Sequence, residues 1–350
     1  MAAERPSPTT DGTERLRVGV IGYGYWGPNL ARNVEANSRM ELAAVADFST
    51  NRLAAAHAVH PWTRKTHDAM DIIRSSDIDA VVIATPPESH RELACAALEA
   101  GKHVLVEKPL ATSPEDAALM RDTAERTGRV LMVDHTFLFT GAVRRIKQYL
   151  DAGELGTVYY FDSTRINLGL FQTRSNVLWD LAPHDVAMLL HLLDQPVTEV
   201  SAIGAWHVED GLENIAYATL RFASGVIAHL HVNWLAPVKI RKTIIGGSRR
   251  MVVYDDMEQS EKVKLYDSGA DRVQTKEDAY RAFVEYRTGD VLVPRLEKAE
   301  ALAVECDHFL DVIAGAPSIS GADLGLDVVR ILHAAQLSMQ SRGCPQEVER

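Results

Sequence analysis

The chain has 350 residues, of which 46% are hydrophobic, and its 48 acidic and 37 basic residues give a formal net charge of −11. This length suits two domains with sizeable cores, and the negative charge argues against nucleic acid as a partner, because phosphate binding depends on clustered Lys and Arg. A phosphorylated small molecule is not excluded, since one local Arg cluster can hold a phosphate on an acidic protein.

The first part of the chain alternates short apolar runs with helical patterns. Gly101 and Gly128 end two of the predicted helices as C-terminal caps. The expected strands are Leu16–Ile21, Leu42–Ala46, Ala80–Ala84, His103–Val106 and Val130–Val133, and the expected helices are Pro28–Ala36, Asn51–Val59, Asp68–Ser75, Glu88–Ala100 and Pro114–Thr127. This alternation predicts an α/β fold, a doubly wound parallel sheet of the Rossmann type over residues 16–140. Its ligand site is expected at the carboxyl ends of the strands.

The pattern changes after about Thr140, where strand-like runs dominate. Residues 141–350 are therefore predicted to form an α+β domain, with a mostly antiparallel open sheet and helices on one face. Hairpin turns are expected at Ala223–Gly225 and Gly246–Ser248. The expected strands are Val158–Ile166, Glu199–Trp206, Ala216–Phe222, Val226–Trp234, Lys239–Ile245 and Met251–Tyr254, and the helices are Ala142–Leu150, Asp180–Leu193, Leu296–Ile313 and Gly321–Met339.

The three cysteines are far apart and show no metal-ligand spacing. Cys95 and Cys306 fall in apolar helical patterns, which predicts buried thiols, and Cys344 makes their number odd. We therefore expect a reducing compartment, the cytoplasm. No apolar stretch approaches the length of a membrane span, and residues 1–15, which lack an apolar signal segment, are expected to be a disordered tail.

Residues 22–27 follow the first strand, open the first helix and fit G-x-G-x-x-G. Glycine there permits a tight turn, close approach of the backbone to a pyrophosphate, and close packing of helix on strand. Asp47 ends the second strand, where its carboxylate can accept hydrogen bonds from the adenosine ribose and repel a 2′-phosphate. Its competing role is to cap the following helix. The pattern predicts NAD rather than NADP, and Arg52 is not expected to receive a phosphate.

Two further turns follow strands of the first sheet, Thr85–Pro87 and Glu107–Pro109. Together with the glycine motif they resemble the Gfo/Idh/MocA oxidoreductases, and the resemblance runs from Leu16 to the last helix. It implies an NAD-dependent enzyme in which Lys108 lies beside the nicotinamide and the reacting hydroxyl, where an ammonium can stabilise charge on the substrate oxygen. A solvated lysine is the alternative. The cofactor-binding candidates are Gly22, Tyr23, Gly24, Tyr25, Trp26, Gly27, Asp47, Thr85, Pro86, Pro87, His90, Glu107 and Lys108.

Residues 179–184 contain the D-x-x-x-H spacing that this family often has. The spacing puts Asp180 and His184 on one face of a helix, and an imidazole can take up a proton near neutral pH. The resemblance makes His184 the expected base and gives Asp180 the task of binding the hydroxyl or holding Lys108. A packed core histidine is the alternative, and it stays open whether Lys108 or His184 accepts the proton. Pro183 fits a helix only near its first turn.

The other substrate-binding candidates come from both domains. His135 resembles a family position near the cleft, and structural packing is an equally good account of it. Residues in the segment before the Trp179 helix could bind sugar hydroxyls, a carboxylate or a phosphate, or could be solvated loop residues. The candidates for direct contact are Lys108, His135, Arg165, Asn167, Asn176, Trp179, Asp180 and His184, and Gln172 and Arg174 share the same segment. The remaining histidines show no ligand spacing, so no metal is predicted.

Residues 24–30, 163–169 and 176–181 are similar to a nucleotide-sugar branch of the family. That branch includes dehydrogenases that oxidise C3 of a UDP-linked N-acetylglucosaminuronate. The direction of the reaction stays open, as do three alternatives: an inositol or polyol dehydrogenase, a keto-sugar reductase, and a non-catalytic NAD-binding sensor. The resemblance also implies a homodimer or homotetramer built through the open sheet. No nucleic acid or membrane is expected as a partner.

Overall fold

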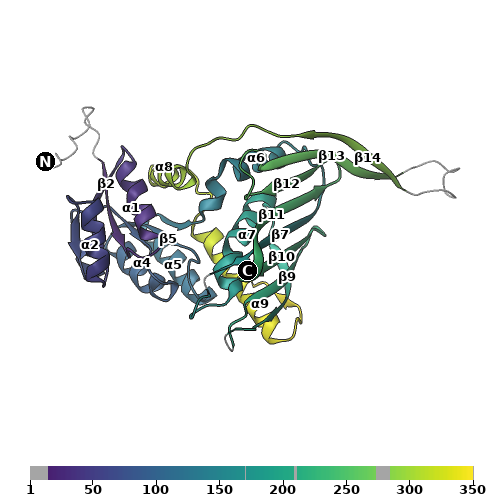
Figure 1. The fold of residues 1–350 in the computed structure, drawn as a ribbon. Coiled ribbons are helices and arrows are strands. Elements are labelled where there is room, and N and C mark those ends of the chain that lie inside the picture. Colours follow the sequence, from purple (N-terminus) through teal and green to yellow (C-terminus); the bar gives the residue numbers. More distant parts are fainter. Residues whose placement is uncertain (1–14, 170, 209–210, 273–283, 350) are drawn as a thin grey trace. The chain divides into compact units, whose positions relative to one another are not determined.

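The computed structural model describes residues 15–169, 171–208, 211–272 and 284–349, so only Arg15 of the predicted tail is described. The chain forms two compact units (Figure 1). The first comprises the described residues up to Phe139 together with Ala299–Val329, and the second comprises Thr140–Lys298 and the residues from Arg330 onward. Residues 299–329, which the sequence analysis grouped with the C-terminal domain, thus belong to the first unit, because helix α8 (Ala301–Ile313) packs on its helix α1 (Gly27–Ala36).

The first unit contains a six-stranded parallel sheet with the strand order β3-β2-β1-β4-β5-β6. Its strands are β1 (Leu16–Ile21), β2 (Met40–Ala46), β3 (Arg64–Thr66), β4 (Ala80–Ile83), β5 (His103–Glu107) and β6 (Leu131–Asp134). The order reverses between β1 and β4, and ligands of doubly wound sheets bind beyond the carboxyl ends of the strands at such a point. The predicted Rossmann-type sheet is confirmed.

Helices connect the strands of this sheet. They are α1, α2 (Thr50–Val59), α3 (Ala69–Ile73), α4 (His90–Glu99) and α5 (Pro114–Thr127), with 3-10 turns η1 (Pro87–Ser89) and η2 (Thr136–Phe139). Gly128 caps α5 with φ +64°, as predicted, and Gly101, with φ +79°, follows the last residues of α4. The last helix, α9 (Ala322–Gln340), begins in the first unit and ends in the second.

The second unit is built on a nine-stranded sheet with the order β14-β13-β12-β11-β7-β10-β9-β8-β15. Its strands are β7 (Val158–Leu168), β8 (Val197–Ala205), β9 (Ile215–Phe222), β10 (Ile227–Asn233), β11 (Leu235–Gly247), β12 (Met251–Asp255), β13 (Val263–Arg272), β14 (Val284–Leu292) and β15 (Gln346–Glu347). Only β7 and β10 pair in parallel among the described strands of this sheet, which confirms the mostly antiparallel prediction. The β13–β14 hairpin was not predicted.

One face of this sheet is covered by helix. Helix α7 (Val177–Leu193) packs on β7, β9 and β10, and α6 (Gly141–Asp151) packs on α7. Along β9 and β10 buried residues alternate with more exposed ones, as expected when only one face is covered. Pro183 corrects an expectation, because α7 starts at Val177 and the proline therefore lies in its second turn. A proline there has no N–H for the carbonyl of Trp179, which the helix tolerates at some cost.

Candidate active site

The glycine loop combines two sterically required glycines with one at which a side chain would meet no clash. Gly22 has φ +95°, and a Cβ on it would lie 2.5 Å from the carbonyl oxygen of Ala84. A Cβ on Gly27 would lie 2.2 Å from the carbonyl oxygen of Gly22. A Cβ on Gly24 would meet nothing closer than the Arg52 guanidinium, at 3.7 Å. The chain's own packing therefore does not require glycine at position 24, which leaves room for a ligand to approach the backbone.

Asp47 is fixed against this loop. Its Oδ2 accepts a hydrogen bond from the N–H of Tyr23 (2.8 Å), and its Oδ1 accepts one from the N–H of Ser49 (2.8 Å). The side chain that caps α2 belongs to Ser49, so the competing role of Asp47 as the helix cap is excluded. Arg52 lies 3.5 Å from Oδ2 and is largely exposed. The carboxylate is thus held at the end of β2, beside the glycine loop.

The turn after β4 and the turn after β5 are joined through His90. This imidazole is fully buried, with Nε2 2.9 Å from the carbonyl oxygen of Thr85 and Nδ1 3.0 Å from that of Pro109. Burial lowers its pKa, although the carbonyls act in the opposite direction. Because both ring nitrogens face backbone oxygens, His90 links the Thr85–Pro87 turn to the segment that carries Lys108, and it has no exposed surface to offer a ligand.

Three carboxyl groups with buried oxygen atoms lie close together on β5, β6 and α8, and one of them belongs to Glu107, the neighbour of Lys108. Glu107 and Asp134 are paired neighbours in the sheet, and Glu305 comes from α8. Asp134 Oδ2 accepts the indole N–H of Trp26 (2.9 Å), and its Oδ1 accepts the hydroxyl of Thr136. Burial, followed by the proximity of Asp134, raises the pKa of both glutamates well above the usual range.

The hydrogen-bond pattern agrees with protonated glutamates. Oε1 of Glu107 and both carboxyl oxygens of Glu305 meet no N–H or O–H donor among the described residues. A protonated carboxyl can itself donate to Asp134, which removes the cost of an orphaned buried charge. Cys306, the neighbour of Glu305, is buried as predicted, and burial raises its pKa to about 12. Cys95 is only half-buried. Sequence reasoning missed Asp134 and Glu305, although Asp134 ends a strand at the expected edge of the sheet.

His135 follows Asp134 and is buried in the structure. Both of its ring nitrogens lack a hydrogen-bond partner among the described residues, and burial lowers its pKa to about 4. The ring is therefore neutral near pH 7. Tyr25, by contrast, is 87% exposed beside the glycine loop, and Tyr23 is buried.

In the second unit, the N-terminal end of α7 carries several of the predicted residues. Asn176 caps the helix by accepting the N–H of Trp179 (3.2 Å), and its amide donates to Glu213 (2.8 Å) and Gln336 (2.7 Å). The side chain of Asn176 is therefore buried, and its hydrogen bonds stabilise the fold. Trp179, Asp180 and His184 are half-buried, and Asp180 and His184 lie one turn apart on α7 as predicted.

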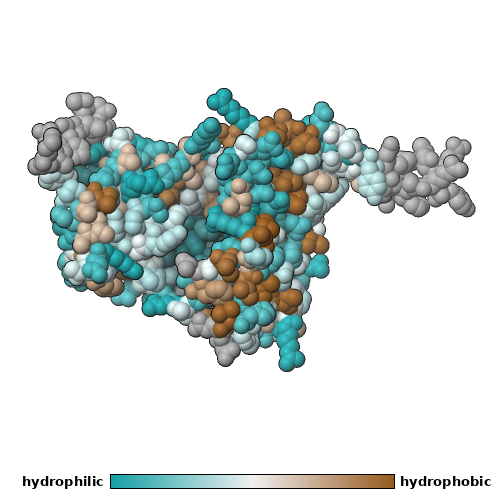
Figure 2. Space-filling model, viewed as in Figure 1, coloured by the Kyte–Doolittle hydropathy of each residue, from teal (hydrophilic) through white to brown (hydrophobic). Residues whose placement is uncertain are grey.

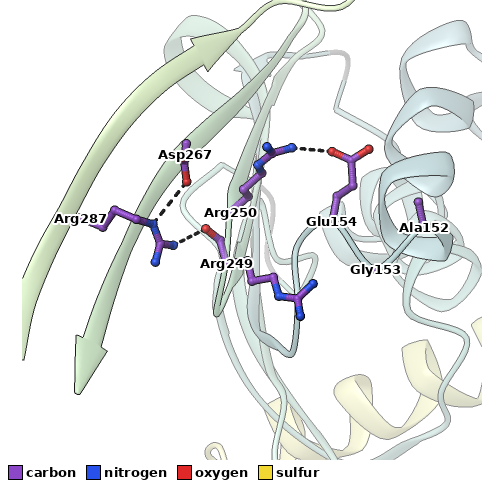
Figure 3. Close-up of a pocket in the computed structure, with 7 residues that line it drawn as sticks. All are labelled: Ala152, Gly153, Glu154, Arg249, Arg250, Asp267 and Arg287. Atoms are coloured by element: carbon purple, nitrogen blue, oxygen red, sulfur yellow. Dashed lines mark hydrogen bonds and ion pairs between the residues drawn. The ribbon is translucent and has the colours of Figure 1, made fainter. Parts of the chain in front are cut away.

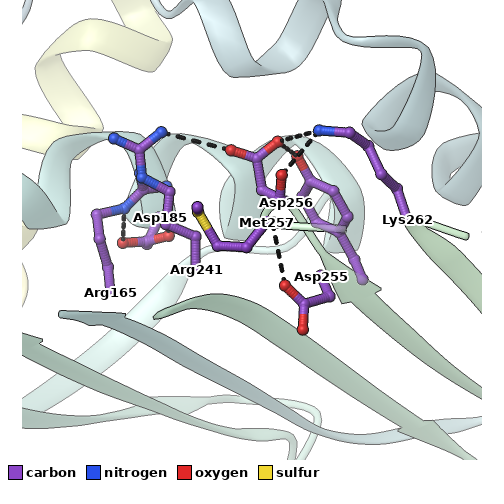
Figure 4. A network of polar contacts seen from close by, with 8 residues as sticks. Arg165, Asp185, Arg241, Asp255, Asp256, Met257 and Lys262 are labelled. Atoms are coloured by element: carbon purple, nitrogen blue, oxygen red, sulfur yellow. Dashed lines mark hydrogen bonds and ion pairs between the residues drawn. The ribbon is translucent and has the colours of Figure 1, made fainter. Parts of the chain in front are cut away.

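Arg165 has a different environment from the one expected. It lies within β7, and its guanidinium makes a bidentate ion pair with Asp185 at 2.7 and 3.0 Å, with both side chains buried (Figure 4). Burial works against the charge of Arg165, but Asp185 raises its pKa. Asn167, two residues further along β7, is half-buried.

A second group in Figure 4 centres on Asp256. Burial opposes its ionisation, but Lys262 (2.8 Å) and Arg241 (3.4 Å) together lower its pKa. Tyr254 donates its hydroxyl to the same carboxylate (3.2 Å). Arg241 pairs with Arg165 in the register of β11 and β7, so the two groups stand side by side on one face of the sheet.

A pocket of about 500 Å³ in the second unit lies at the C-terminal end of α6 (Figure 3). Arg250 is paired with Glu154 (2.6 Å), and Arg287 is bonded to Asp267 (3.3 Å) and to the carbonyl of Arg249. The carboxylates of Glu154 and Asp267 and the negative end of the α6 dipole offset the positive charge of the arginines that line the pocket. None of the predicted site residues lines this pocket, so we do not regard it as the active site.

The described residues contain neither a candidate metal cluster nor a candidate membrane-spanning helix. No group of three or more His, Cys, Asp or Glu side chains among them could hold a metal ion. Within the same part of the chain, no helix has both the length and the apolar character needed to cross a bilayer.

Two family models match the chain. Residues 16–135 match the "Oxidoreductase family, NAD-binding Rossmann fold", and residues 143–253 match the "GFO/IDH/MocA C-terminal domain". Inositol 2-dehydrogenase 2 of Paenarthrobacter aurescens is 29% identical over 95% of this chain and 98% of its own. The 1-carboxy-3-chloro-3,4-dihydroxycyclohexa-1,5-diene dehydrogenase of Comamonas testosteroni is 30% identical, but the match covers 61% of this chain and 57% of that enzyme. The structure of UDP-N-acetylglucosamine 3-dehydrogenase from Acidithiobacillus ferrooxidans is similar with a TM-score of 0.78 at 25% identity, over 94% of this chain and 99% of the other.

Proposed function

The chain belongs to the Gfo/Idh/MocA family of NAD-binding oxidoreductases, and from this premise we propose that it oxidises a secondary hydroxyl of a nucleotide-linked sugar, at C3. The observation that carries the proposal is the glycine loop, where Gly24 alone of the three motif glycines is unrestricted by the chain's own packing. Such a loop fits a pyrophosphate at the N-terminal end of α1. NAD, when bound, supplies the acceptor for the hydride.

We assign the chemistry to Lys108, Asp180 and His184. Oxidation of a hydroxyl removes a hydride from carbon and a proton from oxygen. In this assignment the Lys108 ammonium donates a hydrogen bond to the reacting oxygen and stabilises its developing charge. His184 takes the hydroxyl proton as general base, and Asp180 accepts a hydrogen bond from the substrate and orients it. Asp47 binds the adenosine ribose and disfavours NADP through charge repulsion.

The substrate class is supported by the relatives. UDP-N-acetylglucosamine 3-dehydrogenase is similar over nearly its whole length, in agreement with the sequence resemblance to the nucleotide-sugar branch. An inositol or another polyol is the second candidate, because inositol 2-dehydrogenase 2 matches over 98% of its length. The reverse reaction, reduction of a keto sugar, uses the same side chains.

We also propose that the protein assembles as a homodimer or homotetramer through the open face of its second sheet. On the visible face of the molecule, apolar surface gathers on the second unit, whereas the first unit shows mostly hydrophilic surface (Figure 2). Exposed apolar side chains of that sheet include Ile203, Ile227 and Leu168. Light scattering of the purified protein tests this assembly, and a monomer at all concentrations would contradict it.

The function is tested by following NADH absorbance while the enzyme and NAD are offered UDP- and dTDP-linked sugars, sugar acids and inositols. A response to a nucleotide sugar supports the proposal, whereas a response to inositols alone supports the polyol alternative. If oxidation is not detected, the corresponding keto sugars are offered with NADH. Stoichiometric NAD binding without turnover in either direction would refute the proposal and favour a sensor.

A further inference from the structure

Trp234 makes a direct hydrogen bond to Asp180. The residue follows β10, is 1% exposed and is the largest fully buried side chain among the described residues. Its indole Nε1–H donates to Oδ2 of Asp180 over 2.9 Å. Nothing in the sequence pattern pointed to this contact, because the two residues are 54 positions apart. A bond from a neutral donor to a carboxylate is among the stronger hydrogen bonds of proteins.

Trp234 is itself held on several sides. The backbone N–H of Trp234 donates to the carbonyl of Asn214 (2.9 Å), and the carbonyl of Trp234 accepts the N–H of Gly169 (2.9 Å). A Cβ on Gly169 would lie 3.0 Å from Cδ1 of the indole, so the backbone of Gly169 lies close against the ring. Phe171 packs at a tilt on the same ring, with 5.6 Å between ring centroids. The donor therefore has little freedom to turn away from Asp180.

A carboxylate on the first turn of a helix can normally rotate among several positions. A fixed donor on one oxygen removes that freedom and leaves the other oxygen in a defined direction. We propose that Trp234 is a positioning residue, which orients the Asp180 carboxylate for the substrate hydroxyl. This inference rests on the function proposed above for Asp180, and Trp234 itself needs no contact with substrate or cofactor.

The test is a double-mutant cycle with Trp234→Phe and Asp180→Asn, measured with NAD and UDP-N-acetylglucosamine or myo-inositol, whichever is turned over. Phenylalanine keeps an aromatic ring and removes the donor. We expect Trp234→Phe to lower kcat about tenfold and leave the KM for NAD unchanged. Asp180→Asn is expected to cost less in the Trp234→Phe background than in the wild type, because contacting groups that act together are not additive. Trp206→Phe, at an exposed tryptophan, is the matched control and should retain wild-type kcat.

The outcomes separate the inference from the function on which it rests. Wild-type turnover of Asp180→Asn would refute the role of Asp180, and the positioning role would fall with it. An impaired Asp180→Asn with strictly additive effects of Trp234→Phe would refute the positioning role alone. If Trp234→Phe does not fold, Gly169→Ala is used, because its Cβ would lie 3.0 Å from the indole and 3.1 Å from Nδ2 of Asn167 and would press on the ring while the donor remains present. It should then lower kcat without changing the KM for NAD, and an unchanged kcat would overturn the inference.

Discussion

Replacement of Glu305 by glutamine should remove a contribution that lowers folding stability as pH rises. Glu305 is fully buried, and both its carboxyl oxygens lack a donor among the described residues. Because burial raises its pKa, the folded protein keeps a proton that the unfolded chain loses near pH 4.3, about the pKa of a free glutamate. Linkage then requires that the free energy of unfolding falls as pH rises above that value, until pH reaches the raised pKa of the folded state.

The size of the effect follows from one proton. A group protonated only in the folded state changes stability by about 1.4 kcal/mol per pH unit. Glu107 acts in the same direction, since burial also raises its pKa. Glu305→Gln should therefore remove one of these downward contributions, making the slope of the variant about 1.4 kcal/mol per pH unit more positive than that of the wild type within that window. Below the pKa of a glutamate in the unfolded chain, the substitution should not change the slope, because Glu305 is then protonated in both the folded and the unfolded state.

Urea unfolding between about pH 5 and pH 8, followed by circular dichroism, measures these slopes. Glu92→Gln provides the control, because Glu92 is exposed on α4 of the same unit and should leave the slope unchanged. If the curves of Glu305→Gln and the wild type run parallel, Glu305 is ionised in the folded protein, and the reasoning about the buried carboxyl groups is wrong.

Three further predictions concern the proposed site. Lys108→Ala and His184→Ala should each lower kcat about 100-fold while the affinity for NAD stays nearly intact, and wild-type rates in both would contradict the assigned chemistry. Asp47→Ala should weaken NAD binding and reduce the preference for NAD over NADP, measured as the ratio of the KM values for the two cofactors. An unchanged preference would mean that another residue binds the ribose. Gly27→Ala brings a Cβ to 2.2 Å from the Gly22 carbonyl oxygen, so it should lower both the affinity for NAD, measured by titration, and the melting temperature. Wild-type values of both quantities would contradict the tight packing of the loop.

Features set by local sequence could be predicted. The glycine loop, the caps at Gly101 and Gly128, and the alternation of strands and helices follow from backbone sterics and from periodicity over a few neighbouring residues. Lys108 could be placed at the end of a strand, and Asp180 and His184 on one helix face, for the same reason.

The partners of these residues could not be predicted, because long-range pairing decides them. Arg165 was expected to contact a ligand, but its guanidinium is buried against Asp185, which lies on helix α7. The same limit applies to Asp134 and Glu305, which are far apart in the chain and come close because α8 packs on η2, the turn that follows β6, and on α1. The role of a charged residue depends on whether a buried partner neutralises its charge, and the identity of that partner cannot be read from the local sequence.

The two units hold their candidate residues by the same physical arrangement, in which an accessible group is fixed by a buried one. Fully buried His90 links the backbone beside Lys108 to the turn after β4, and buried Trp234 fixes half-buried Asp180. A buried side chain in a packed environment has few alternative rotamers, so the geometry it imposes is retained without substrate. Substitution of the accessible residues should therefore change rate with little change in stability. Substitution of the buried residues His90 and Trp234 should change both the rate and the stability, since the contacts by which they orient the site also belong to the core.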